Sequence, residues 1–192
     1  MRSKLLTLPN ILTVSRIALM PLLGMFLEMD MRLGALSILI IAALTDFFDG
    51  YFARRNKEES KFGKLMDPVA DKIMLAIILL FLVADPVRQL SPWLAGLLVA
   101  REFLITGLRA VASSMGLIIA AGKMGKWKTA LQFLGLGFVI YYQPIGPFPV
   151  LGAGYYMLWT ATVLSYWSMW TYMRNAYNAL NHLEDVTTED IE

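Results

Sequence analysis

Residues 46–72 read DFFDGYFARRNKEESKFGKLMDPVADK and join two apolar stretches through a short basic loop. One pair of aspartates, Asp46 and Asp49, precedes the loop, and a second pair, Asp67 and Asp71, follows it. Carboxylates at the edge of a hydrocarbon layer are costly and mark functional sites by default. We therefore take this segment as the centre of both the fold and the function.

The composition around this segment is that of a membrane protein. Of the 192 residues, 57% are hydrophobic and only 17% are charged, which predicts an all-α, polytopic integral membrane protein rather than a soluble globule. The sequence has no cysteine, so disulfides are excluded. A net charge of +2 is too small to indicate a nucleic-acid-binding protein.

Six apolar stretches come close to the length of about 20 residues that a transmembrane helix needs. They are predicted at Leu8–Leu27, Leu33–Phe52, Phe62–Val83, Trp93–Ala112, Gly125–Tyr142 and Ala153–Tyr172. We expect one membrane domain over residues 1–180 and an acidic, disordered tail over residues 181–192.

The basic residues favour one orientation of these six stretches. The amino terminus and the loops after the second and fourth stretches carry most of the lysines and arginines, whereas the opposite loops carry only Arg32 and Arg88. By the positive-inside rule, both termini and residues 46–72 face the cytoplasm. The expected location is the inner membrane of a bacterium.

The four aspartates have the spacing of a cation site. Asp46 and Asp49 are three residues apart and Asp67 and Asp71 are four apart, so each pair projects from one face of a helix. Oxygen ligands without histidine or cysteine suit magnesium or manganese, and four carboxylates could hold two ions. Two such ions can clamp a phosphoryl displacement, and in a membrane the expected electrophile is a lipid phosphate.

Small residues accompany the aspartates and leave room for a ligand against the helices. They are Gly50, Ala53, Gly63 and Ala70. The alternative to a cation site is a set of salt bridges between the aspartates and basic neighbours such as Arg54 and Lys72.

A polar stripe in the first stretch is formed by Asn10, Thr13 and Arg16. Polar residues on a membrane helix turn inward, so we expect this stripe to face the interior of the bundle. The competing interpretation is helix capping by Asn10 and snorkelling of Arg16 to the interface.

The aspartate segment resembles the signature of the CDP-alcohol phosphatidyltransferases. The matching pattern is Asp46-x-x-Asp49-Gly50-x-x-Ala53-Arg54, eight residues, then Gly63-x-x-x-Asp67-x-x-x-Asp71. The resemblance implies a six-helix membrane fold, a homodimer and a site that opens to the cytoplasm. It also implies that an alcohol attacks the lipid-bearing phosphate of a CDP-linked lipid and that CMP leaves.

The resemblance further implies a role for each matching residue. Asp46, Asp49, Asp67 and Asp71 would hold two Mg²⁺ or Mn²⁺ ions, and Asp71 would also be the general base. The CDP-lipid pocket would include Asp49, Gly50, Ala53, Arg54 and Gly63, together with the stripe of Asn10, Thr13 and Arg16.

Other motifs are similar to the branch of the family that takes glycerol 3-phosphate as its acceptor. They are Leu8–Thr13 with Arg16, Arg101–Phe103 with Arg109, and Gly125–Thr129 with Gln132. Because this acceptor is a dianion, we expect Arg109, Lys126 and Lys128 to bind its phosphate. The alternative for the two lysines is ordinary positive-inside topology.

Several residues inside the apolar stretches have expected structural roles. Arg101 and Glu102 should face the bundle interior and find partners, although adjacent residues need not pair with one another. Gly107, Gly135 and Gly137 are expected to allow close helix contact.

Two alternatives to transfer from CDP-diacylglycerol to glycerol 3-phosphate remain open. The first is the same chemistry with another acceptor, such as inositol phosphate, serine or another alcohol. The second is a divalent-cation transporter, which would place its carboxylates near the middle of the bilayer rather than at the cytoplasmic end.

Overall fold

The computed structural model describes residues 8–56, 61–116 and 124–189, with side chains described for residue 15 and for residues 18–45, 69–116 and 127–179. Within these ranges the chain forms six helices and no strand. The helices are α1 (Leu8–Glu28), α2 (Arg32–Asn56), α3 (Lys61–Ala84), α4 (Pro92–Ser114), α5 (Met124–Tyr141) and α6 (Val150–Glu189). Each overlaps one predicted apolar stretch, so the all-α prediction is confirmed.

The prediction that these helices cross a membrane is not confirmed. Among the described residues, no helix is both long enough and apolar enough to cross a membrane. α6 continues past its predicted end at Tyr172 to Glu189. No helix boundary therefore marks residue 180, where the sequence analysis divided the chain. The domain over 1–180 and the disordered tail over 181–192 stay predictions.

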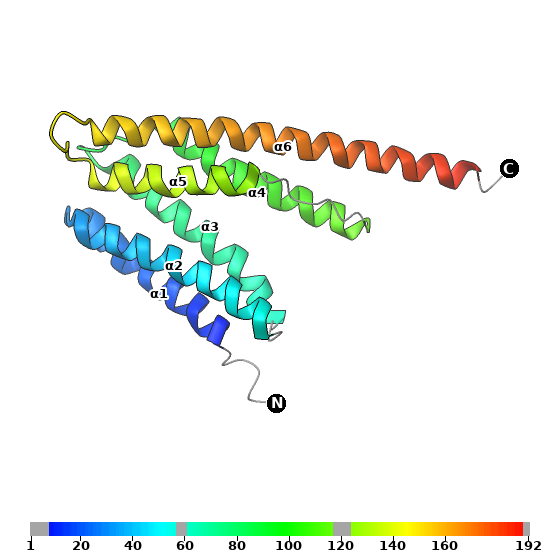
Figure 1. Ribbon diagram of the computed structural model, residues 1–192, viewed down its shortest axis with the longest axis horizontal. Coiled ribbons are helices and arrows are strands. Elements are labelled where there is room, and N and C mark those ends of the chain that lie inside the picture. Colours follow the sequence, from blue (N-terminus) through cyan, green and yellow to red (C-terminus); the bar gives the residue numbers. More distant parts are fainter. Residues whose placement is uncertain (1–7, 57–60, 117–123, 190–192) are drawn as a thin grey trace.

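The helices alternate in direction (Figure 1). The α1–α2, α3–α4 and α5–α6 turns gather at one end of the molecule, which we call the turn end. The first turn of α1 and the last turn of α6 lie away from it, toward the opposite end, which we call the chain end. Because consecutive helices are antiparallel, the first turn of α1 and the last turn of α6 lie on the same side as the last turn of α2 and the first turn of α3. The orientation of the termini in a membrane stays a prediction.

Two sets of helices make up the bundle. α1 packs against α2 and α3, while α6 packs against α5 and α4. Contacts of α3 with α4 and of α2 with α5 join the two sets. A continuous apolar core runs through both, with Leu23, Leu79, Leu94 and Leu136 buried in it.

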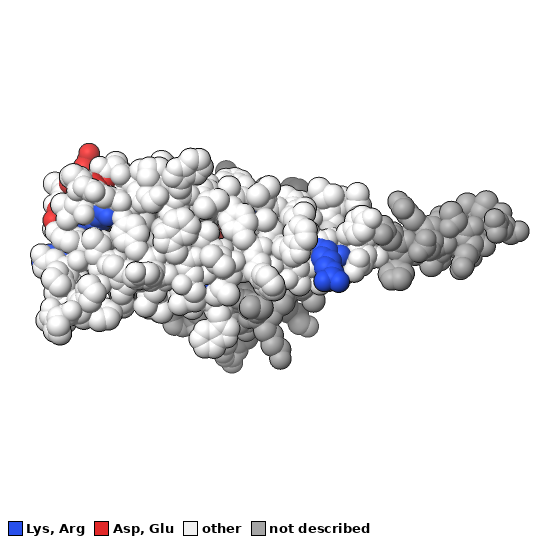
Figure 2. All heavy atoms as spheres, turned by 90° about the horizontal axis from the view of Figure 1, so that it is seen from above, with Lys and Arg blue, Asp and Glu red and all other residues white. Residues whose placement is uncertain are grey.

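The outside of the bundle is also apolar. Figure 2 shows a face almost without charged side chains between the turn end and a basic group near the chain end. The sequence explains this surface, because no Asp, Glu, Lys, Arg or His occurs between Lys128 and Arg174.

Glycine sets the closest approach of α5 to α6. A Cβ added at Gly154 would lie 2.9 Å from the Val139 backbone nitrogen and 3.0 Å from the Gly135 carbonyl oxygen. Gly135 therefore allows the close contact that the sequence predicts, whereas an added Cβ at Gly137 would lie 3.4 Å from Leu36, an ordinary van der Waals contact that does not require glycine. At Gly107 an added Cβ would meet no described atom within 4 Å, so there the prediction is wrong.

Gly154→Ala is expected to lower the free energy of unfolding by about 1–3 kcal/mol, because the new methyl group meets backbone that cannot move without separating the helices. Thermal unfolding in detergent, followed by helical circular dichroism, measures this loss. Gly152→Ala is the matched control, since its Cβ would meet only Pro149 at 3.9 Å. Equal stability of the two variants would contradict the close contact.

Candidate active site

The two aspartate pairs lie on helical backbone at the chain end of α2 and α3. Asp46 and Asp49 belong to the last three turns of α2, and Asp67 and Asp71 to the first three turns of α3. The side chain of Asp71 is half-buried, while those of the other three lie outside the described residues. The helical spacing assumed for each pair is thus present, and the meeting of the four carboxylates stays a prediction.

The residues predicted for the CDP-lipid pocket come from three helices that pack together, since α1 contacts both α2 and α3. Asn10, Thr13 and Arg16 belong to α1, Gly50, Ala53 and Arg54 to α2, and Gly63 to α3. Their side chains lie outside the described residues. The fold therefore supplies a shared location for these helices, and the pocket itself stays a prediction.

The donor set of the four aspartates suits a hard divalent cation. All of its ligand atoms are carboxylate oxygens, which magnesium and manganese prefer. Among the described side chains, no group of three or more His, Cys, Asp or Glu is gathered. Three of the four predicted ligands lie outside that set, so this finding does not bear on them.

The predicted acceptor cations lie in different surroundings. Lys128, in the second turn of α5, is only 8% exposed. Arg109 on α4 is exposed, with its guanidinium carbon 5.9 Å from the centre of the Tyr172 ring on α6. The side chain of Lys126 lies outside the described residues. A buried ammonium needs a compensating charge or hydrogen bonds, which makes Lys128 the candidate for an anion.

Arg101 and Glu102 form an ion pair with each other on α4. Arg101 is 4% exposed, so the prediction that it faces the interior is confirmed. Its Nε atom is buried without a hydrogen-bond partner among the described residues. The pair neutralises a charge that the apolar interior would otherwise oppose.

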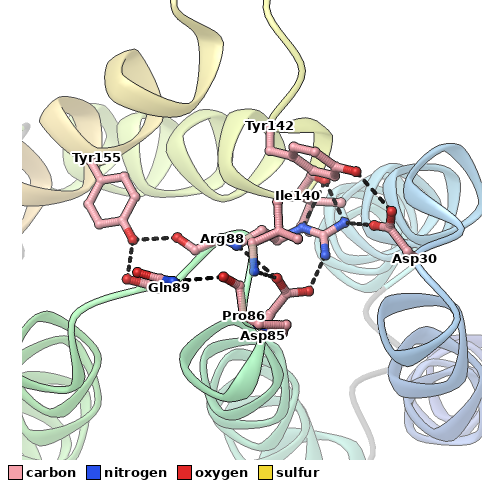
Figure 3. Close-up of polar contacts among 9 residues, drawn as sticks. Asp30, Asp85, Pro86, Arg88, Gln89, Ile140, Tyr142 and Tyr155 are labelled. Atoms are coloured by element: carbon pink, nitrogen blue, oxygen red, sulfur yellow. Dashed lines mark hydrogen bonds and ion pairs between the residues drawn. The ribbon is translucent and has the colours of Figure 1, made fainter.

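A second polar cluster, at the turn end, centres on the buried Arg88 (Figure 3). Its guanidinium donates to Asp30 at 2.8 Å, pairs with Asp85, and donates to the Ile140 carbonyl oxygen at 3.1 Å. The Tyr142 ring lies over it, with the guanidinium carbon 4.6 Å from the ring centre. We call these five residues the Arg88 cluster.

The Arg88 cluster joins both sets of helices. Asp30 comes from the α1–α2 turn, Asp85 and Arg88 from the α3–α4 turn, Ile140 from α5 and Tyr142 from the segment after it. The Tyr155 hydroxyl on α6 adds a contact to the Arg88 carbonyl oxygen at 2.6 Å. Sequence reasoning missed this cluster, since it treated Arg88 only as a charge in an outer loop.

The cluster also perturbs Asp30. A hydrogen bond from the Tyr142 hydroxyl, at 2.8 Å, lowers the pKa of this carboxyl below its ordinary value of 3.8, and the hydrogen bond and charge of Arg88 act in the same direction against a partial desolvation. Because the pKa is lower in the folded state, the stabilisation is fully present above the unfolded pKa and is lost as the pH falls through the folded pKa.

Acidification below pH 4 is therefore expected to lower the melting temperature of the parent protein more than that of Asp30→Asn, which has no charge to lose. The two melting temperatures, measured in detergent at pH steps between about 3 and 6, should differ above the unfolded pKa and converge as the pH falls through the folded pKa. A difference that does not depend on pH would show that the Asp30 charge plays no part.

Comparison with known proteins bears on the chemistry of this fold. A family model described as CDP-alcohol phosphatidyltransferase matches residues 6–167. An Arabidopsis thaliana protein named CDP-diacylglycerol--glycerol-3-phosphate 3-phosphatidyltransferase 2 is 35% identical over 193 residues, which cover 93% of this chain and 83% of that protein. The Pseudomonas fluorescens protein named CDP-diacylglycerol--glycerol-3-phosphate 3-phosphatidyltransferase is 34% identical over 178 residues, covering 90% and 91%.

A third relative carries a different name. An Oryza sativa subsp. japonica protein named Cardiolipin synthase (CMP-forming) is 33% identical over 195 residues, which cover 92% of this chain and 59% of that protein. Relatives of similar identity to this chain thus carry two different names.

Proposed function

Because this chain belongs to the CDP-alcohol phosphatidyltransferase family, we propose that it transfers a phosphatidyl group from CDP-diacylglycerol to sn-glycerol 3-phosphate. The products are phosphatidylglycerophosphate and CMP, and the process served is phospholipid biosynthesis. The observation that carries the proposal is the aspartate signature at the chain end of α2 and α3, inside the matched residues 6–167.

The four aspartates are assigned to two divalent cations. Asp46, Asp49, Asp67 and Asp71 would hold Mg²⁺ or Mn²⁺, since their oxygen-only donor set suits either ion. When bound, these ions neutralise the diphosphate and make CMP a better leaving group.

The remaining residues bind and orient the substrates. Residues of α1, α2 and α3 hold the CDP group, and the free primary hydroxyl of the acceptor approaches the lipid-bearing phosphorus. A new oxygen–phosphorus bond forms, the bond from phosphorus to CMP breaks, and the hydroxyl proton passes to the Asp71 carboxylate as general base. The role of Asp71 as base rests on the family signature.

The acceptor phosphate is assigned to Arg109, Lys126 and Lys128. Of these, Lys128 has the strongest physical support, because its ammonium is buried near the start of a helix, where an anion is also favoured by the helix dipole.

Lys128→Ala is expected to raise the apparent KM for glycerol 3-phosphate about 10- to 100-fold, because it removes a hydrogen bond between charged groups. The KM for CDP-diacylglycerol should not change. Arg174→Ala is the matched control, since Arg174 is an exposed cation on α6. An unchanged KM for glycerol 3-phosphate would mean that Lys128 does not bind the acceptor phosphate and only contributes to the positive-inside charge pattern.

The membrane placement is part of the same proposal. Large apolar side chains lie exposed around the bundle, including Leu80, Trp93, Trp127, Trp167 and Trp170. A soluble monomer rarely exposes so much contiguous apolar surface, whereas acyl chains would cover it. We place the helices in the inner membrane of a bacterium, with the termini and the active site on the cytoplasmic side; a homodimer is the assembly that the family resemblance implies.

One assay separates this function from its alternatives. Purified protein receives CDP-diacylglycerol and Mg²⁺ or Mn²⁺, and CMP release is followed with glycerol 3-phosphate, inositol phosphate, serine, phosphatidylglycerol or no acceptor. Glycerol 3-phosphate should give the largest increase. A larger increase with another alcohol would support phosphatidyl transfer but to a different acceptor. Phosphatidylglycerol is included because one relative is named cardiolipin synthase. If no acceptor increases CMP release, the proposal that the protein is a phosphatidyltransferase is wrong.

A further inference from the structure

The contact between α5 and α6 is apolar near the turn end and polar toward the chain end. Each helix contributes one buried stripe at helical spacing. On α5 the stripe is Val139, Gly135, Gln132 and Lys128, and on α6 it is Gly154, Leu158, Thr162 and Ser165.

The glycine contacts set the register of these two stripes. Gly154 lies against Val139, and Gly135 lies against Leu158. Because the helices are antiparallel, moving toward the chain end lowers the residue number on α5 and raises it on α6 (Figure 1). Continuing the two stripes places Gln132 level with Thr162 and Lys128 level with Ser165.

This polar half of the interface is left with unused hydrogen-bonding capacity. Ser165 is fully buried, and its Oγ atom has no hydrogen-bond partner among the described residues. Lys128 and Gln132 are each 8% exposed, and neither forms a hydrogen bond or ion pair with another residue in the described part of the chain. Only Thr162 is satisfied, through the Leu158 carbonyl oxygen at 2.8 Å. Buried polar groups of this kind normally have partners.

Along the bundle axis, the polar half of the α5–α6 interface lies at about the same distance from the turn end as the predicted cation site. α2 packs on α5 in the opposite direction, with Leu36 and Leu39 nearest to Gly137. Nine residues further toward the chain end, the same register brings Lys128 level with residues 45–48 of α2, which include Asp46. A ligand on Lys128 would therefore lie at the depth where the phosphoryl chemistry is proposed.

We propose that Gln132 and Ser165 bind the secondary hydroxyl of glycerol 3-phosphate and so determine acceptor specificity, while Lys128 binds its phosphate. This assignment rests on the proposed function. Because side chains lean toward the amino terminus of their helix, the Gln132 amide leans toward the level of Ser165, and the Lys128 ammonium extends beyond that level toward the chain end. A neutral amide and a neutral hydroxyl both donate and accept, which suits a hydroxyl group, whereas the ammonium suits a phosphate. The three-carbon acceptor presents these two groups in the same order as the α5 stripe.

The test compares two acceptors in three proteins. Glycerol 3-phosphate and 3-hydroxypropyl phosphate share the primary hydroxyl and the phosphate, but the second lacks the secondary hydroxyl. The parent, Ser165→Ala and Gln132→Met are each assayed for kcat/KM with both acceptors. The parent should prefer glycerol 3-phosphate about 10- to 100-fold, and each variant should lose most of that preference through its rate with glycerol 3-phosphate alone.

A purely structural role would give a different result. Because Ser165 Oγ has no partner among the described residues, Ser165→Ala should leave the melting temperature unchanged or raise it while the preference falls. Thr160→Val is the matched control, since its hydroxyl is exposed and donates to the Tyr156 carbonyl oxygen of its own helix. It should keep the full preference.

The outcomes separate this inference from the function on which it rests. If glycerol 3-phosphate does not stimulate CMP release in the parent, the proposed function fails. If it does, but Ser165→Ala and Gln132→Met keep the preference of the parent, ordered water rather than the acceptor satisfies these side chains and the inference is overturned. A lower melting temperature of Ser165→Ala, without a change in preference, would also overturn it.

Discussion

Asp71→Asn is expected to reduce CMP release with glycerol 3-phosphate by about 10²–10⁴-fold and to leave the helical fold intact. An asparagine keeps nearly the same shape and loses the charge, so it can neither accept the proton of the attacking hydroxyl nor serve as an anionic ligand. Asp71 is half-buried on the third turn of α3. The loss should appear in kcat, measured with saturating CDP-diacylglycerol and glycerol 3-phosphate.

The control for this variant is Glu28→Gln, which neutralises an exposed carboxylate at the turn end of α1. It should retain the activity of the parent. Circular dichroism and melting temperature confirm that both variants are folded. If Asp71→Asn keeps more than about a tenth of the parent kcat, Asp71 is not the general base.

Arg88→Met is expected to lower the free energy of unfolding by about 3–5 kcal/mol, because removal of one partner strands the other buried polar groups of the Arg88 cluster. Asp85 would lose its cation and the Ile140 carbonyl oxygen its donor. Methionine fills much of the same volume, so the effect comes from charge and hydrogen bonding rather than from a cavity. Thermal unfolding at neutral pH in detergent measures it.

Arg32→Met provides the comparison at the same end of the molecule. The Arg32 guanidinium carbon lies 5.7 Å from the ring centres of Tyr141 and Tyr142, a contact worth at most about 1 kcal/mol at a partly exposed site. An equal loss of stability in the two variants would mean that Arg88 has no special role. Because the cluster joins α1, α3 and α5, its loss should also disturb the alignment of the aspartates with Lys128.

The helices themselves could be predicted from the sequence, because long apolar stretches ended by charges or turn residues leave little choice of boundary. The α1 and α4 predictions differ from the observed helices by at most two residues at each end. α6 is the exception, since its helix runs on past its predicted end at Tyr172 to Glu189.

The side-chain contacts could not be predicted in the same way. Arg88 and Asp30 are 58 residues apart, and Tyr142 and Asp30 are 112 apart, so no local spacing reveals that they meet. The sequence also could not decide the role of Lys128, because a lysine at the start of a helix is consistent with both the positive-inside rule and a buried anion site. The burial of Lys128 in the structure distinguishes these two readings.

The two sets of helices divide the proposed reaction between them. α1, α2 and α3 carry the aspartates and the residues predicted to hold the CDP group, whereas α4, α5 and α6 carry the cations and the polar stripe for the acceptor. Transfer requires both, since the attacking hydroxyl and the lipid-bearing phosphate must meet in line. The Arg88 cluster joins the two sets at the turn end, away from the chemistry.

The central claim is that glycerol 3-phosphate receives the phosphatidyl group, and the most direct measurement follows labelled acceptor into lipid. Purified protein in detergent is given CDP-diacylglycerol, divalent cation and radiolabelled glycerol 3-phosphate, and both CMP and solvent-extractable label are quantified. We expect label to enter the lipid fraction in a one-to-one ratio with CMP, and to stop when CDP-diacylglycerol or the cation is omitted. Release of CMP without incorporation of label would contradict this account.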